Sequence, residues 1–263
     1  GSKLPAKLIG HDEKTDLALL KVDSDRKFTY VKFAEGDTRV GDWVVAVGNP
    51  FGLGGTVTAG IVSARGREIG AGPYDDFIQI DAAVNRGNSG GPAFNVNGEV
   101  IGVNTAIFSP SGGNVGIAFA IPASTAERIV NDLREHGTVV RGWLGVQIQN
   151  ISQDIADSLG LKEAKGALVS EPQADGPGMK AGLKSGDAIT AVNGQSISDP
   201  RDLASKIAGM APGTKVTVTY WRDGKSNTVD VILGKLPASD KQASADDNDT
   251  QPQAKPTSLD DFG

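Results

Sequence analysis

The first half of the chain alternates short apolar segments with Gly, Asn, Asp and Pro. Between residues 8 and 122 six of these segments have the length of a β-strand, and each ends at a residue that favours a turn. They cover residues 17–22, 43–47, 56–62, 77–84, 100–107 and 115–121. The dipeptide Asn97-Gly98 readily takes the positive φ angles of a two-residue turn, so it predicts a hairpin. The pattern predicts a β-barrel or sandwich.

A helix is predicted to close this region at residues 125–136. Ser124 and Glu127 have the spacing of a capping box, and apolar residues then recur at helical intervals. Gly137 supplies a left-handed stop.

A second unit is predicted between Gly142 and about residue 236. Its apolar segments are at residues 144–149, 167–170, 188–192, 216–221 and 229–233. One helix is expected after Ser152 and another after Asp199-Pro200, where Asp can cap and Pro suits the first helical position. Asp223-Gly224 predicts the last hairpin.

The composition changes at residue 237, where Asp, Ser, Ala, Gln and Pro replace the apolar segments. We interpret residues 237–263 as a disordered acidic linker. Residues 246–249 faintly resemble a calcium loop, but the turn glycine and the distal Glu of such a loop are missing. The solvated linker is therefore the better interpretation.

Composition narrows the possible partners. The net charge is −6 and no Lys/Arg cluster occurs, so no nucleic acid or anionic membrane surface is expected to bind. The sequence contains no apolar run of about 18 residues, so membrane insertion is not expected, and no signal peptide is visible. The chain has no Cys, which excludes disulfides and thiol chemistry. We predict neither a metal site nor a cofactor.

A serine among glycines, Ser89 in GNSGGP (residues 87–92), is the strongest candidate for chemistry. Because the neighbouring glycines carry no side chain, backbone N–H groups could approach a substrate carbonyl. A plain Gly-rich turn is the simpler alternative. The run also fits the G-x-S-x-G elbow of α/β-hydrolases, but that elbow needs a helix just after the serine. Pro92 and the Asn97-Gly98 hairpin follow instead.

Four ordered motifs make the resemblance specific. They are TDLALLKV at 15–22, AVGNPFG at 46–52, QIDAAVNRGNSGGP at 79–92 and GIAFAIP at 116–122. Together they resemble the HtrA (DegP/Deg) serine protease family. This resemblance implies a mainly β protein with a trypsin-like double β-barrel and then a PDZ domain. It also implies an ATP-independent serine endopeptidase of envelope protein quality control, located in the periplasm.

The resemblance assigns roles to residues around the serine. Ser89 matches the nucleophile, and Asp16 matches the acid of a Ser-His-Asp triad. The backbone N–H groups of Gly87 and Ser89 would form the oxyanion hole, with Asn88 shaping the loop.

Specificity and regulation are also implied. Val84 and Ile107 match positions that line the primary specificity pocket, which implies small aliphatic P1 residues; both can equally be plain core. Residues 65–76 resemble a regulatory loop that senses PDZ ligands, with Arg67 as its contact.

The catalytic histidine is the departure from the family pattern. The chain has two histidines, His11 and His136, and neither matches the family's catalytic position. The chain opens with Gly1 rather than Met, which indicates a processed or engineered piece. We expect it to begin after the catalytic His, with the first barrel largely missing. Without the base we predict negligible protease activity for this polypeptide alone.

The segment RGWLGV at residues 141–146 resembles the carboxylate-binding loop of HtrA-type PDZ domains. The implied peptide-binding residues are Gly142, Trp143, Leu144, Gly145 and Val146. An extended peptide would add as a strand and place its last side chain in an apolar pocket. Trp143, Leu144 and the helix containing Leu203 and Ile207 would line that pocket.

The expected organisation has four parts. They are a partial protease domain at 1–122, a closing helix and linker at 123–140, a PDZ domain at 141–236 and an acidic linker at 237–263. Expected partners are unfolded or misfolded polypeptides and hydrophobic C-terminal peptides, and the intact protein is expected to form a trimer-based homo-oligomer. A second PDZ domain is expected beyond the linker. A non-catalytic peptide-binding or chaperone fragment remains the alternative function.

Overall fold

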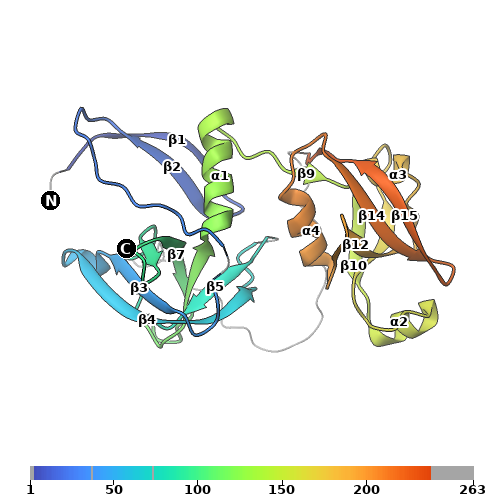
Figure 1. Ribbon diagram of the computed structural model, residues 1–263, viewed down its shortest axis with the longest axis horizontal. Coiled ribbons are helices and arrows are strands. Elements are labelled where there is room, and N and C mark those ends of the chain that lie inside the picture. The colour runs from blue at the N-terminus through green and yellow to red at the C-terminus, as the bar shows by residue number, and fades with distance from the viewer. Residues whose placement is uncertain (1–2, 37, 73, 238–263) are drawn as a thin grey trace. The chain divides into compact units, whose positions relative to one another are not determined.

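The computed structural model describes residues 3–36, 38–72 and 74–237. Two compact units divide between Val139 and Val140, and each is described by itself (Figure 1). The predicted acidic linker lies outside the described residues from position 238 onward.

The first unit is built on a closed six-stranded antiparallel barrel in the order β3-β4-β5-β8-β7-β6. Inward-facing side chains such as Val44, Ile80 and Ile101 fill its interior. The strands are β3 (Trp43–Gly48), β4 (Thr56–Arg67), β5 (Phe77–Ile80), β6 (Pro92–Phe94), β7 (Val100–Ile107) and β8 (Ala118–Pro122), with a short 3-10 helix at Pro50–Gly52. A complete barrel of the predicted kind is therefore present.

A separate two-stranded sheet precedes the barrel, formed by β1 (Ala6–Asp12) and β2 (Leu17–Val22). The sequence pattern predicted β2 but missed β1. Helix α1 (Ala123–His136) buries Ile129 and Leu133 in one apolar cluster with Leu17 of β2 and Phe119 of β8. The helix thus joins the small sheet to the barrel through a common core.

Two local predictions in this unit were wrong in detail. Helix α1 begins at Ala123 after Pro122, and no side chain caps it. Ser124 therefore lies inside the first turn and cannot form the predicted capping box. The hairpin between β6 and β7 turns at Asn95–Gly98, with the Gly98 N–H bonded to the Asn95 carbonyl at 3.1 Å. Gly98 has a positive φ of 77° and Asn97 does not, so the turn is longer than the predicted two-residue loop.

The second unit is an antiparallel sheet in the order β10-β11-β12-β14-β15, with β13 paired to β12 and a separate β9–β16 pair. Its strands are β9 (Gly142–Trp143), β10 (Val146–Asn150), β11 (Ala167–Pro172), β12 (Ala188–Val192), β13 (Gln195–Ser196), β14 (Lys215–Arg222), β15 (Lys225–Ile232) and β16 (Gly234–Lys235). Its helices are α2 (Gln153–Leu159), α3 (Pro177–Lys180) and α4 (Pro200–Ala208). Helix α4 packs beside β10, because Leu203 and Ile207 share a core with Val146 and Ile148 (Figure 1).

The predicted helix after Ser152, the predicted cap at Asp199 and the predicted last turn of this unit are confirmed. The Ser152 hydroxyl accepts the Ile155 N–H at 3.3 Å at the start of α2. The Asp199 carboxylate accepts two backbone N–H groups of the first turn of α4. Asp223 and Gly224 both have positive φ angles, 52° and 72°, and form the two-residue turn between β14 and β15. These signals are local, which is why the sequence alone revealed them.

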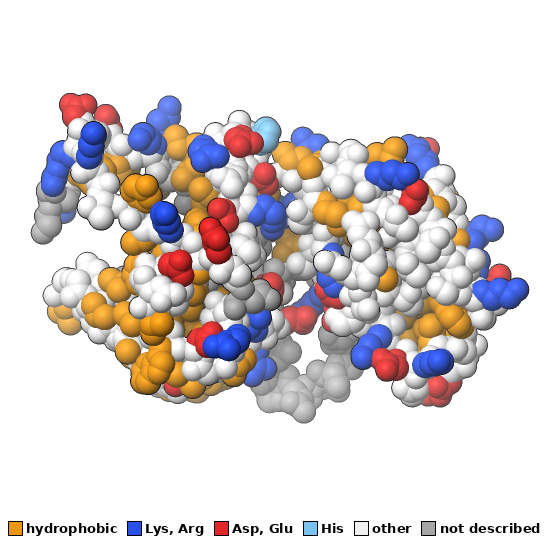
Figure 2. Space-filling view, viewed as in Figure 1, with side chains coloured by type: hydrophobic (Ala, Val, Ile, Leu, Met, Phe, Trp, Pro, Cys, Tyr) orange, Lys and Arg blue, Asp and Glu red, His pale blue; other side chains and the backbone are white. Residues whose placement is uncertain are grey.

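Apolar side chains remain on the surface of the first unit. Trp43 of β3 and Val57 of β4 are 62% and 66% exposed, and Leu8 and Leu20 of the small sheet are 52% and 58% exposed. Figure 2 shows hydrophobic side chains gathered over the β3–β4 side. Among the described residues, no helix is both long and apolar enough to cross a membrane.

Candidate active site

Ser89 and Asp16 meet at a third residue, Thr105. The Ser89 hydroxyl, in the turn before β6, donates to the Thr105 carbonyl at 2.9 Å. The Thr105 hydroxyl, in β7, donates to Asp16 Oδ2 at 2.5 Å. Ser89 and Asp16 are thus held in one hydrogen-bonded group, although they are 73 positions apart in the sequence. From the sequence, only Ile107 of this strand was assigned a role, as a pocket residue, and Thr105 was missed.

The backbone at Asp16 is itself unusual. Its φ is 55°, a left-handed conformation that non-glycine residues rarely adopt. The preceding turn is fixed by Thr15, whose hydroxyl donates to Asp12 Oδ2 at 2.5 Å. Asp12 is only 8% exposed. Such backbone strain is often found at functional sites.

The loop around Ser89 leaves two backbone amides available. The Asn88 N–H donates to the Asn85 carbonyl at 3.0 Å, whereas the amides of Gly87 and Ser89 have no acceptor among the described residues. Gly87 has φ 99°, and a Cβ there would lie 2.2 Å from the Asn49 carbonyl oxygen. Only glycine fits this position, and it leaves the two N–H groups that an oxyanion hole requires.

Asn88 holds the loop against the barrel. It is 2% exposed, and its Oδ1 is buried without a hydrogen-bond partner in the described chain. A Cβ added at Gly48 of β3 would lie 2.3 Å from that oxygen and 2.8 Å from the Asn88 Cα. The nucleophile loop therefore depends on the close approach of β3.

The two predicted pocket residues both belong to the barrel core. Val84 is 2% exposed, and Ile107 packs against the same cluster. Their role in a specificity pocket stays a prediction.

Neither histidine serves Ser89 in this structure. His11 lies in β1 opposite Ala18, with its Nε2 3.6 Å from a Glu13 carboxylate oxygen. His136 is the last residue of α1. No hydrogen bond joins either imidazole to Ser89 in the described part of the chain.

Arg67 was predicted as the contact of a regulatory loop at residues 65–76; the structure places it at the end of β4, and its regulatory role stays a prediction. Strand β4 continues to Arg67, and its guanidinium Nε donates to Gln79 Oε1 of β5 at 2.9 Å. The strand is long because β5 still pairs with it at this point, opposite Phe77. The loop proper follows, and the Asp75 carboxylate accepts two of its backbone N–H groups.

The predicted carboxylate-binding loop of the second unit has free amides as well. The carbonyls of Leu144 and Gly145 accept backbone N–H groups at 2.7 and 2.9 Å, but their own N–H groups have no acceptor among the described residues. Gly145 has φ 70°, and a Cβ would lie 2.8 Å from Pro177 Cδ. The neighbouring strand β10 is at the end of the sheet and pairs with β11 alone within the described residues. Free amides and a free strand edge lie side by side.

The apolar residues expected to line the peptide pocket differ in exposure. Leu203 and Ile207 of α4 are 1% and 4% exposed, and Leu144 is 4% exposed, so they belong to the core. Trp143 and Val146 are half-buried and offer more surface. Gly142 is fixed by its N–H bond to the Met210 carbonyl at 2.8 Å.

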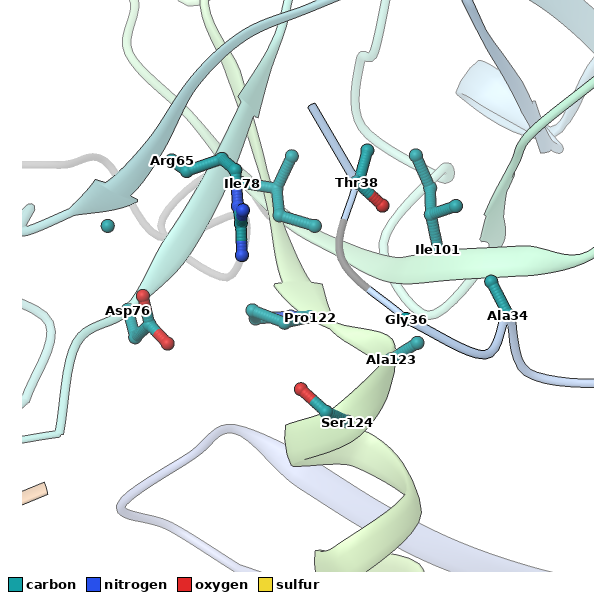
Figure 3. Close-up of a pocket in the computed structure, with 11 residues that line it drawn as sticks. Ala34, Gly36, Thr38, Arg65, Asp76, Ile78, Ile101, Pro122, Ala123 and Ser124 are labelled. Atoms are coloured by element: carbon teal, nitrogen blue, oxygen red, sulfur yellow. The ribbon is translucent and has the colours of Figure 1, made fainter. Parts of the chain in front are cut away.

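A distinct cavity of about 160 Å³ lies at the start of α1 in the first unit (Figure 3). Arg65, Asp76 and Ser124 provide polar groups on its wall, and Ile78 and Ile101 provide apolar ones. Arg65 and Asp76 are the two ends of the predicted regulatory segment, whereas none of the predicted catalytic, pocket or peptide-binding residues lines the cavity.

The fold and the site together define a class. A closed antiparallel barrel carries Ser89, which Thr105 joins to Asp16, and a separate antiparallel sheet with β10 at its end follows. Residues 1–103 match the trypsin-like peptidase domain family, and residues 142–233 match the PDZ domain family. The chain is a trypsin-like serine protease region joined to a PDZ domain.

Similar proteins identify the family. The chain is 64% identical to the probable periplasmic serine endoprotease DegP-like of Rhizobium meliloti (strain 1021), over 100% of this chain and 53% of that protein. It is 62% identical to the protein of the same description from Brucella suis biovar 1 (strain 1330), over 100% and 52%. The chain spans about half the length of these curated relatives.

Similar solved structures indicate the same family. The HtrA-type protease AlgW with decapeptide is 43% identical and superposes with a TM-score of 0.76, over 90% of this chain and 73% of that one. The serine endoprotease from Yersinia pestis is 34% identical, with a TM-score of 0.62 over 88% and 76%. The chain belongs to the HtrA family of serine proteases.

Proposed function

We propose that the chain carries the nucleophile, oxyanion hole and peptide-binding module of a periplasmic, ATP-independent serine endopeptidase that acts on unfolded polypeptides. The observation that carries this proposal is the group Ser89–Thr105–Asp16. Ser89 attacks the scissile carbonyl, and the amides of Gly87 and Ser89 stabilise the oxyanion. Asp16 orients and stabilises an imidazole, and Thr105 fixes the carboxylate for that task.

This polypeptide alone lacks the base that the mechanism requires. A serine hydroxyl is a weak nucleophile near neutral pH unless an imidazole accepts its proton. Ser89 donates to a backbone carbonyl instead. We therefore expect negligible turnover from the 263-residue chain, because loss of the base removes most of the triad's contribution.

Cleavage assays with casein or a fluorogenic peptide as substrate test both the role of Ser89 as nucleophile and the inactivity of the chain alone. The chain alone should give no cleavage above the Ser89→Ala background. A longer polypeptide that supplies a histidine should cleave, and Ser89→Ala should abolish that activity. Ser111→Ala is a matched control, since Ser111 is exposed and has no hydrogen-bond partner among the described residues. Cleavage by the chain alone that disappears in Ser89→Ala would refute the inactivity.

The PDZ unit is proposed to bind hydrophobic C-terminal peptides by strand addition to β10. The amides of Leu144 and Gly145 would hold the terminal carboxylate, since no described residue accepts a hydrogen bond from either. The related AlgW was solved with a decapeptide, which supports peptide binding in this family. Fluorescence anisotropy with a labelled peptide tests the proposal, and its C-terminally amidated form should bind at least tenfold more weakly.

The alternative is a peptide-binding or chaperone fragment without catalysis. The edge of β10, which has no pairing strand on its outer side within residues 74–237, favours it for the chain alone. Suppression of aggregation of an unfolded client that is equal for the chain and for Ser89→Ala would support this alternative.

The proposal also includes the domain bounds, the substrate specificity, the regulation and the oligomeric state. Residues 1–122 act as the protease region, 123–140 close and connect it, and 141–236 bind peptide. Val84 and Ile107 restrict P1 to small aliphatic side chains, and Arg67 takes part in regulation. The intact protein forms a trimer-based homo-oligomer, which sedimentation analysis can test.

A further inference from the structure

One loop of the protease unit is fastened to the segment that leads to Ser89. The loop connects β7 to β8, and the Phe108 N–H closes its base by donating to the Ile117 carbonyl at 3.1 Å. Its sequence, SPSGGNVG at residues 109–116, contains three glycines. Gly112 and Gly116 have positive φ angles of 83° and 84°. Such a loop has little intrinsic rigidity, so its contacts decide its conformation.

Asn114 makes the contacts that fasten it. The Asn114 backbone N–H donates to Asn85 Oδ1 at 3.0 Å, and its side-chain Nδ2 donates to the Val84 carbonyl at 3.0 Å. Its Oδ1 accepts the Gly116 N–H at 2.9 Å, which shapes the loop itself. One residue therefore binds two successive residues of the other segment while fixing its own turn.

These contacts continue into the nucleophile loop. The Asn85 carbonyl accepts the Asn88 N–H at 3.0 Å, and the Asn88 carbonyl accepts the Gly91 N–H at 2.9 Å. A hydrogen-bonded path thus runs from Asn114 through Asn85 and Asn88 to the residues on both sides of Ser89. Val84, whose carbonyl Asn114 holds, is 2% exposed and cannot shift without disturbing the barrel core.

We propose that Asn114 is a positioning residue, which fixes the 84–91 segment so that Ser89 and the oxyanion amides keep their geometry and the Val84 wall keeps its place. The inference rests on the proposed role of Ser89 as nucleophile and deepens it. Two features make Asn the fitting residue. It donates to Val84 and accepts from Gly116 at the same time, and a purely apolar side chain does neither.

Amide hydrogen exchange by NMR on the 263-residue chain tests the coupling without requiring activity. Asn114→Ala should accelerate exchange at the Asn88 and Gly91 amides about tenfold, the factor that one or two net hydrogen bonds represent. Asn114→Asp should accelerate it similarly, because the carboxylate still accepts from Gly116 but cannot donate to Val84. The control Ser111→Ala, in the same loop, should leave exchange unchanged.

Unchanged exchange in Asn114→Asp overturns the proposal, and so does an equal acceleration in Ser111→Ala. If Asn114→Ala fails to fold, Asn85→Ala replaces it, since that change removes only the acceptor of the Asn114 backbone N–H. Asn85→Ala should then accelerate the Asn88 amide about fivefold, and no acceleration overturns the proposal.

A kinetic measurement separates positioning from general stability. In a polypeptide that supplies the catalytic histidine, Asn114→Asp should lower kcat for a peptide with Val at P1 about tenfold, with KM changing less than threefold. The preference for Val over Leu at P1 should fall. Unaltered kcat and preference overturn the positioning role. If cleavage survives Ser89→Ala, the proposed function is refuted. The hydrogen-exchange result then still tests the coupling between Asn114 and the 84–91 segment.

Discussion

Replacing Gly48 of β3 by Ala is expected to disturb the nucleophile loop, although Gly48 lies outside that loop. The new Cβ would lie 2.3 Å from Asn88 Oδ1 and 2.8 Å from both the Asn88 Cα and Cγ. Ordinary carbon contacts need at least about 3.5 Å, so β3 and the loop must separate by roughly 1 Å. The contact includes the Asn88 backbone, and a side-chain rotation alone cannot relieve it.

The energetic cost follows from this overlap. Inserting a methyl group into a packed interior costs about 1–3 kcal/mol, and the backbone contact places Gly48→Ala near the upper end. The thermal midpoint of the first unit should fall by about 5–10 °C. Gly55→Ala is the matched control, because Gly55 has an ordinary φ and nothing lies within 4 Å of its added Cβ. That change should stay within about 0.5 kcal/mol.

Hydrogen exchange measured by mass spectrometry during urea unfolding can follow each unit through its own peptides. Gly48→Ala should destabilise peptides of the barrel and leave those of the PDZ unit unchanged. If Gly48→Ala and Gly55→Ala unfold at the same urea concentration, the close packing of Asn88 on β3 is refuted. The reasoning also fails if only the PDZ peptides respond.

Three further predictions address the triad, the peptide loop and pH. Thr105→Val removes the hydroxyl that donates to Asp16 but keeps the carbonyl for Ser89, so kcat of a histidine-supplied protease should fall about tenfold at nearly constant KM. Gly145→Ala forces a side chain into φ 70° and towards Pro177, so peptide affinity measured by anisotropy should fall at least tenfold. Burial raises the pKa of Asp202, but the hydrogen bond from the Lys206 ammonium and that from a backbone amide outweigh it and hold the pKa below its ordinary 3.8. The folded state thus favours the carboxylate, and the stability this gives above about pH 4 should be lost as the pH falls through the lowered pKa.

Each of these three predictions has a control whose result would contradict it. Ser111→Ala should leave kcat unchanged, and an equal loss there would deny Thr105 a specific role. Gly224→Ala has a similar φ of 72° but open space around its Cβ, so it should retain peptide affinity. Urea titrations of the PDZ unit between pH 6 and pH 3 should show a weaker pH dependence in Lys206→Gln, and an identical curve would contradict the assignment to this ion pair.

Sequence signals that act over a few residues predicted their structures well. The helix after Ser152, the cap at Asp199 and the turn at Asp223 were confirmed, since each depends on a side chain or a φ angle within one turn of the chain. Strand β1 was missed because its residues are mostly exposed and show no buried face. The capping box at Ser124 failed because Pro122 ends the preceding strand and places the helix start two residues earlier than the motif requires.

The sequence by itself determined the family, through motifs in which Ser89 and Asp16 stand in fixed local contexts. It also determined the alternation of strands and turns, because apolar periodicity and turn residues act locally. Only the tertiary structure decided that Thr105 joins Ser89 to Asp16 and that Asn114 fastens a distant loop to Val84. These contacts link residues far apart in the chain, and their existence depends on barrel closure and strand register, which no local pattern specifies.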